Sequence, residues 1–168
     1  MANVVANVLV GTGTLYYNTT PGTVSASVTT EFGFTEDGVT LEYTADVADI
    51  EVEEATFPIN RVITKETFQV VCNLAENLLA NLENAMAGAL TGGAGIVDLG
   101  GGAIRDMAIR FVGKTTGGLT RTVYIPYAHP VGAVGMAYKK GEKTIIPVAF
   151  AAYQGVAGAD VVVITDAA

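Results

Sequence analysis

The residues with the best claim to enzyme chemistry are Gly113-Lys114-Thr115, which match the end of a phosphate-binding loop. The complete motif needs a glycine five residues before Gly113, and this chain has Ala108 there. The surrounding residues alternate as strand residues do, and no helical pattern follows, whereas the motif opens a helix. Nucleotide binding at this segment is therefore disfavoured.

His129 and Cys72 are the single histidine and the single cysteine of the chain. One of each cannot form a disulfide or a thiolate–imidazole metal site within the chain, so Cys72 is expected to be a small buried apolar side chain. His129 precedes Pro130 and has no serine or cysteine near it in sequence, which favours a loop histidine over a catalytic base. We expect no enzyme activity, no cofactor and no metal.

Acidic and aliphatic residues alternate over residues 49–53, which predicts a strand with carboxylates on one face. This strand should end at Phe57-Pro58, because proline has no N–H for a ladder. Two interpretations stay open, a solvated outer face and an anionic surface with a purpose. The acidic residues of that face are Asp49, Glu51 and Glu53.

A single helix is predicted at about 74–87. Asn73 followed by Glu76 forms the pattern of an N-cap with a capping-box acid, and Gly88 is placed to end the helix. Apolar residues recur every four positions, so we expect one face of the helix to pack on a sheet as core. The predicted helix core consists of Leu74, Leu78, Leu82 and Met86.

The remainder of the chain is predicted to be mostly strands. Asp37-Gly38 is a hairpin turn signal, and a lysine-rich turn follows at 139–142. The glycine-rich segment 89–102 is predicted as a flexible loop whose glycines Gly92, Gly93, Gly95 and Gly100 are candidates for contact between subunits. Residues 1–15 are predicted to form a short strand or an arm. Strands are expected near 24–34, 39–45, 105–112, 119–125, 131–138, 144–153 and 161–165.

Length and composition favour one folded domain over residues 1–168, since half of the residues are hydrophobic and 15% are charged. The longest apolar run, 145–153, contains Pro147 and is far shorter than the roughly 20 residues that span a bilayer, so we expect no membrane segment and no signal peptide. With one helix against many strands, the predicted fold is mainly β, a β-sandwich or barrel with one flanking helix.

The charge is unevenly distributed along the chain. The net charge of −8 opposes tight binding to nucleic acid. Residues 1–100 contain two basic residues against thirteen acids, a net charge of −11, whereas residues 101–168 contain seven basic residues against four acids, a net charge of +3. This asymmetry permits head-to-tail attraction between copies.

The order of several short segments resembles the major tail tube protein of long, non-contractile bacteriophage tails, over a range from about Phe32 to Phe150. The segments that carry the resemblance are EFGFTEDGV at 31–39, DIEVE at 49–53, PI at 58–59, NLAENL at 73–78, KKGEK at 139–143 and IPVAFAA at 146–152.

The resemblance implies hexameric rings whose inner strands form a continuous β-barrel and which stack into a tube that conducts DNA into the host. It implies a virion protein assembled in the host cytoplasm, with further copies, tape measure protein and tail terminator or tail tip proteins as partners. DNA would pass without specific binding. If the strand over 49–53 repeats around such a ring, Asp49, Glu51 and Glu53 are candidates to form an anionic band that faces the lumen, and a solvated exterior face is the alternative. Two alternatives remain, the inner tube of a contractile tail or injection system and a monomeric β-sandwich module that binds carbohydrate or protein.

Overall fold

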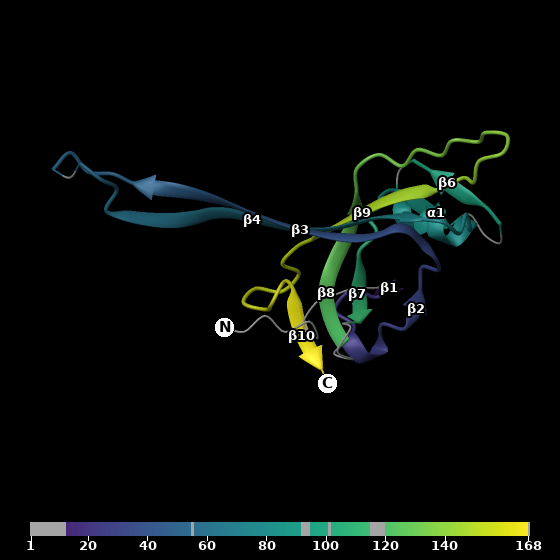
Figure 1. The fold of residues 1–168 in the computed structure, drawn as a ribbon, viewed down its shortest axis with the longest axis horizontal. Coiled ribbons are helices and arrows are strands. Elements are labelled where there is room, and N and C mark those ends of the chain that lie inside the picture. Colours follow the sequence, from purple (N-terminus) through teal and green to yellow (C-terminus); the bar gives the residue numbers. More distant parts are fainter. Residues whose placement is uncertain (1–12, 55, 92–94, 101, 115–119, 168) are drawn as a thin grey trace, which may run out of the picture.

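The computed structural model describes residues 13–54, 56–91, 95–100, 102–114 and 120–167, and this part of the chain is mainly β with one α-helix (Figure 1). The expected fold class is confirmed at that level. In chain order the elements are β1 (Gly13–Asn18), a 3₁₀ turn (Ser25–Ser27), β2 (Thr30–Glu31), β3 (Thr35–Ile50), β4 (Asn60–Leu74), α1 (Leu79–Ala85), β5 (Ala89–Thr91), β6 (Val97–Leu99), β7 (Met107–Lys114), β8 (Thr120–Val131), β9 (Ile146–Ala152) and β10 (Val163–Ala167).

The main sheet is antiparallel and open, with the strand order β2-β1-β7-β8-β9-β4-β3, and β10 pairs with β8. Strand β8 is shared by two parts of this sheet. Its first half, Thr120–Tyr124, pairs with β10, whereas its last residues, Ala128–Val131, pair with β9. In Figure 1 β7, β8 and β10 run across the direction of β3, β4 and β9. The described sheet therefore divides beyond β8 instead of closing into a barrel.

The core lies where the two parts of the sheet cross. Phe32 stands at its centre, with its ring centroid 4.3 Å from that of Tyr17 and 5.4 Å from that of Phe150. The first part of strand β7 is fully buried, since Met107, Ala108 and Ile109 are consecutive and inaccessible to solvent. Other fully buried core residues are Leu15, Val70, Leu74, Ile125 and Ile146.

The predicted boundaries of the helix are wrong, because α1 covers only Leu79–Ala85. Asn73 is a strand residue that pairs with Glu36 and Pro147, so it does not cap a helix. Glu76 accepts a hydrogen bond of 3.3 Å from the backbone N–H of Phe34 instead of completing a capping box. Hydrogen bonding to two neighbouring strands outweighs the local capping pattern.

The four residues predicted as the helix core do not lie together on one face of the helix. Leu74 is buried as the last residue of β4, while Leu78 is the N-cap residue and is 55% exposed. Leu82 is half-buried and packs against the core, as predicted, whereas Met86 is half-buried and is not part of that cluster. Gly88 does not end the helix, which closes in extended conformation at Met86. The buried residues of α1 are Asn81, Asn84 and Ala85.

Asp37-Gly38 is not a hairpin turn. Both residues have positive φ, 61° and 81°, as such a turn requires, but they lie inside β3 at a shift in its register with β4. Glu36 faces Asn73 and Val39 faces Cys72, so the two residues between them bulge out of the ladder. A left-handed backbone serves a bulge as well as a turn, and β3 therefore continues to Ile50.

Several other predictions need correction. The segment 24–34 contains a 3₁₀ turn and the short β2 instead of a continuous strand, and 131–138 is not a strand. The glycine-rich segment 89–102 contains the antiparallel pair β5 and β6. Strands near 105–112, 119–125, 144–153 and 161–165 are confirmed, as is the turn at 139–142, where Glu142 N–H donates to the Lys139 carbonyl over 3.3 Å. The predicted strand or arm before Gly13 lies outside the described residues.

Candidate functional site

The most distinctive surface is the outer part of the β3–β4 pair, residues 43–68, called here the projecting hairpin. Strand β9 pairs with β4 only from Gln69 to Leu74, so within the described part of the chain the pairs from Tyr43↔Phe68 out to Ile50↔Asn60 have no third strand. Nine residues of β4 extend beyond that point, a length of about 30 Å. Figure 1 shows this hairpin running far from the body of the protein.

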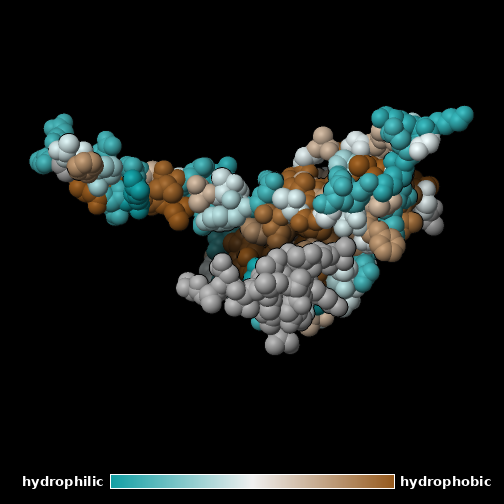
Figure 2. All heavy atoms as spheres, viewed as in Figure 1, coloured by the Kyte–Doolittle hydropathy of each residue, from teal (hydrophilic) through white to brown (hydrophobic). Residues whose placement is uncertain are grey.

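Apolar side chains are exposed on both faces of the projecting hairpin. Val47 faces Ile63 and the next residue, Ala48, faces Val62, so neighbouring pairs place apolar groups on opposite faces. Brown patches along the hairpin in Figure 2 mark this surface. Eight of its described large hydrophobic residues are exposed: Tyr43, Val47, Ile50, Val52, Phe57, Ile59, Val62 and Ile63.

The tip of the projecting hairpin is acidic, but its acids do not share one strand face. Strand β3 ends at Ile50, whose carbonyl accepts a hydrogen bond of 2.9 Å from Ile59 N–H across the turn. Glu51 and Glu53 therefore lie in the turn, which corrects the predicted strand over 49–53. Asp49 forms an exposed ion pair with Arg61 at 2.7 Å. The lumen assignment of the three acids stays a prediction, because only assembled copies form a lumen.

The loop between β8 and β9, residues 132–145, lies at the opposite end of the long axis (Figure 1) and is called here the lysine loop. Lys139 pairs with Glu142 at 3.2 Å, and Lys143 pairs with Glu36 at 2.8 Å. Lys140 is exposed, and no ion pair is found for it among the described residues. Tyr138 beside it is 74% exposed. This end therefore combines an aromatic ring with positive charge.

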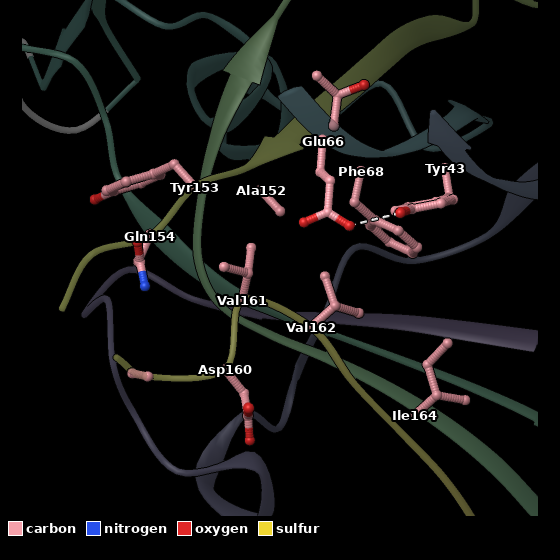
Figure 3. A pocket seen from close by; sticks show the side chains of 12 residues that line it. Tyr43, Glu66, Phe68, Ala152, Tyr153, Gln154, Asp160, Val161, Val162 and Ile164 are labelled. Carbon is pink, nitrogen blue, oxygen red and sulfur yellow. Dashed lines mark hydrogen bonds between the residues drawn. The ribbon is translucent and has the colours of Figure 1, made fainter. Parts of the chain in front are cut away.

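A hollow of about 680 Å³ lies at the root of the projecting hairpin, where the sheet divides (Figure 3). On the wall formed by β3 and β4, the Tyr43 hydroxyl donates a hydrogen bond of 2.6 Å to Glu66 Oε1. This bond to a carboxylate raises the pKa of Tyr43, because ionising the phenol would remove the donor. The lining residues are Tyr43, Glu66, Thr67, Phe68, Ala152, Tyr153, Gln154, Ala159, Asp160, Val161, Val162 and Ile164.

The hollow combines an apolar wall with a few polar groups. Phe68 of β4 and the neighbouring Val162 and Ile164 around the start of β10 point into it from two segments of the chain in Figure 3. Burial, followed by a hydrogen bond to Asp106, raises the pKa of Tyr153 to about 12, so this phenol stays neutral at neutral pH. The residues that line the hollow include no histidine, cysteine or serine. The arrangement suits binding of apolar groups.

The residues first considered for chemistry are dispersed over the fold. Gly113 is buried near the end of β7, and Thr115 lies outside the described residues. His129 is a half-buried strand residue of β8, contrary to the predicted loop position, and its ring centroid lies 5.5 Å from that of Tyr153. Cys72 is buried as predicted, and burial raises the pKa of its thiol to about 12. Within the described ranges, no three His, Cys, Asp or Glu side chains form a metal-binding group.

The candidate glycines of the 89–102 segment lie only in part within the described residues. Gly92 and Gly93 fall outside them, whereas Gly95 and Gly100 have positive φ of 79° and 108° around β6.

Sequence reasoning missed the exposed apolar residues of the projecting hairpin. Val62-Ile63 was a usable signal, since adjacent aliphatic residues in a two-stranded ribbon must point to opposite faces.

Comparison of the sequence with protein-family models and with curated proteins finds no match to either. In the part of the chain that the structure describes, every helix is too short or too polar to cross a membrane.

Proposed function

We propose that this protein is a structural virion protein that assembles into stacked hexameric rings and forms the tail tube of a long, non-contractile bacteriophage tail. The observation that carries the proposal is the projecting hairpin, which exposes apolar side chains on both faces and whose outer part pairs with no third strand among the described residues. Such a ribbon is marginally stable in water by itself. A neighbouring subunit that covers it supplies the missing contacts.

The apolar surface of the hairpin is large enough to drive association. Its eight exposed large hydrophobic side chains gain on the order of 10 kcal/mol when a partner buries them. Association costs about 4–15 kcal/mol in lost freedom of motion. The two quantities are comparable, and in a ring each copy makes contact with two neighbours. Closure of the ring therefore favours the assembled state.

Open strand edges support the same proposal. The outer edge of β3, 16 residues long, has no partner other than β4 within the described residues, and the outer edge of β10 is likewise unpaired there. Long unpaired edges promote uncontrolled pairing between chains, and closure of strands into a shared barrel removes them. The hexameric ring and its inner barrel are the arrangement that the sequence resemblance implies.

The charge of the chain suits a conduit. A net charge of −8 disfavours retention of a polyanion, so DNA moves through the tube without specific binding. Tape measure protein inside the tube and terminator or tip proteins at its ends are the remaining proposed partners.

Shortening the projecting hairpin tests this proposal. Ala45 faces Glu66 in the ladder, so residues 46–65 can be replaced by a two-residue Asn-Gly turn. The core residues of β4 from Val70 onward are untouched, and the variant should fold. Sedimentation velocity should show large assemblies for the unaltered protein and monomers for the variant. Monomers for both, at high concentration, would contradict the proposal.

A further inference from the structure

The two ends of the molecule carry opposite charges and each exposes an aromatic ring. The tip of the projecting hairpin holds Asp49, Glu51, Glu53 and Glu54 within six positions, and Arg61 is its one basic neighbour in an ion pair. The lysine loop holds three lysines and one glutamate within 139–143. Phe57 at the tip is 81% exposed, and Tyr138 of the lysine loop is 74% exposed.

We propose that the hairpin tip of one copy binds the lysine loop of a second copy, in a head-to-tail contact. The contact places Glu51, Glu53 and Glu54 against Lys139 and Lys140, and Phe57 against Tyr138. The inference rests on the proposed function in one respect, that the protein assembles with itself. It goes further by naming the two surfaces that meet.

The partner surface belongs to another copy because one chain cannot bring its own ends together. The hairpin tip and the lysine loop lie at opposite ends of the long axis in Figure 1, with the body of the sheet between them. Figure 2 shows hydrophilic side chains at both ends of the same view. Contact therefore requires a second molecule placed end to end with the first.

The lysine loop is the best complement to the acidic tip among the described basic residues. Arg121 is held by Asp166 through two hydrogen bonds of 2.7 and 2.8 Å, and Arg105 pairs with Glu83 at 2.5 Å. The Arg110 guanidinium lies over the ring of Tyr16 at 4.7 Å. Lys65 belongs to the projecting hairpin itself, where it lies opposite Asp46 in the ladder. Lys140, at the far end, is exposed without an ion pair among the described residues.

The chemistry of the contact combines selectivity with apolar burial. Complementary charges orient two surfaces and reject a tip meeting a tip, which would oppose like charges. Phe57 and Tyr138 supply apolar area that becomes buried at the centre of the contact, whereas the charged residues around them contribute little apolar area. Because the two surfaces differ, the contact is heterologous and repeats from copy to copy, which produces a closed ring or an open-ended stack.

Charge reversal at each end, alone and together, tests the proposal. One variant carries Glu51→Lys and Glu53→Lys, which leaves the Asp49–Arg61 pair in place. The other carries Lys139→Glu and Lys140→Glu, which leaves the Lys143–Glu36 pair in place. Each variant should raise the protein concentration needed for assembly about tenfold or more, and combining all four changes should restore assembly. A control with Glu31→Lys and Glu42→Lys, two exposed residues in the body of the sheet, has the same charge change as the tip variant and should assemble normally.

The outcomes separate this inference from the proposed function. If the unaltered protein assembles and both single-end variants assemble equally well, the head-to-tail contact is wrong and the proposed function stands. If the unaltered protein stays monomeric, both are wrong. Assembled tubes of the Glu51→Lys and Glu53→Lys variant that form normally but retain DNA would support the lumen assignment of these acids instead.

Cross-linking of the unaltered protein provides a measurement that needs no variant. A zero-length carbodiimide joins a carboxylate to a lysine amine only where the two are in contact. Mixed copies with different isotope labels should yield peptides that join 51–54 of one copy to 139–140 of another. Intermolecular products that never include these two segments would overturn the proposal.

Discussion

Asn81 donates a hydrogen bond of 3.0 Å from its buried side-chain amide to the backbone carbonyl of Phe32, 49 positions earlier in the chain. The same amide nitrogen donates to the carbonyl of Glu76 over 3.1 Å. Helix α1 is thus attached to the loop before β3 through a polar group on its inner face. Asparagine residues on a short helix therefore form part of its packing against the body of the protein.

Replacing Asn81 by alanine should destabilise the monomer by about 1–3 kcal/mol, because the Phe32 carbonyl would be left buried without its donor. Asn77, which is exposed next to the helix, is the matched control, and its replacement by alanine should change stability by less than about 0.5 kcal/mol. Urea unfolding of both variants measures the difference. Equal costs at the two positions would contradict the assigned role of Asn81.

Leu74 and Leu78 should respond oppositely to truncation. Leu74→Ala should cost about 2–5 kcal/mol, because Leu74 is fully buried at the end of β4. Leu78→Ala should cost less than about 1 kcal/mol, since Leu78 is 55% exposed. A helix over 74–87 with a leucine core would instead make both changes costly. Unfolding by denaturant in the two variants distinguishes the structures.

Burial of Cys72 should make the native protein sensitive to alkali. Its thiol has a pKa of about 12 in the folded state against an ordinary value of 9.0. A pKa raised on folding contributes stability that is complete below pH 9 and is lost as the pH rises from 9 toward 12. Urea unfolding should therefore show a smaller loss of stability between pH 8 and pH 10.5 for Cys72→Val than for the unaltered protein.

The pKa of Tyr153 is also raised, to about 12, so this phenol adds to the loss of stability in alkali. Both the unaltered protein and the Cys72→Val variant keep Tyr153, so its contribution cancels when the two are compared.

Labelling of the thiol provides the control for burial of Cys72. A maleimide at pH 7.5 should leave Cys72 of the folded protein unmodified and should modify it fully in urea. Rapid labelling of the folded protein would show that Cys72 is accessible.

Local patterns predicted the strands well where alternation was the dominant signal. The strand predicted near 105–112 is confirmed as β7, a central strand of the sheet. Proline residues were a less reliable signal for the end of a strand. Strand β8 continues past Pro126, and β9 contains Pro147 at a position where its pairing with β8 has not yet begun. Where a strand has no partner on one side, a proline whose missing N–H would face that side costs no hydrogen bond of the ladder.

The errors share one physical cause, the competition of long-range pairing with local signals. Asn73 and Glu76 match a helix cap, but Asn73 enters the ladder with β3 and β9. Asp37-Gly38 specifies a left-handed backbone correctly, yet its position opposite Asn73 and Cys72 makes it a bulge. The projecting hairpin was not foreseen, because its length depends on where β9 stops pairing with β4.

Electron microscopy of the concentrated protein in negative stain tests the central claim most directly. We expect rings with a central channel, and stacks of such rings that form tubes. The hairpin-shortened variant, with residues 46–65 replaced by Asn-Gly, should show neither. Fields that contain only compact monomeric particles of the unaltered protein, in low salt and in high salt alike, would contradict the claim that this chain builds a tail tube.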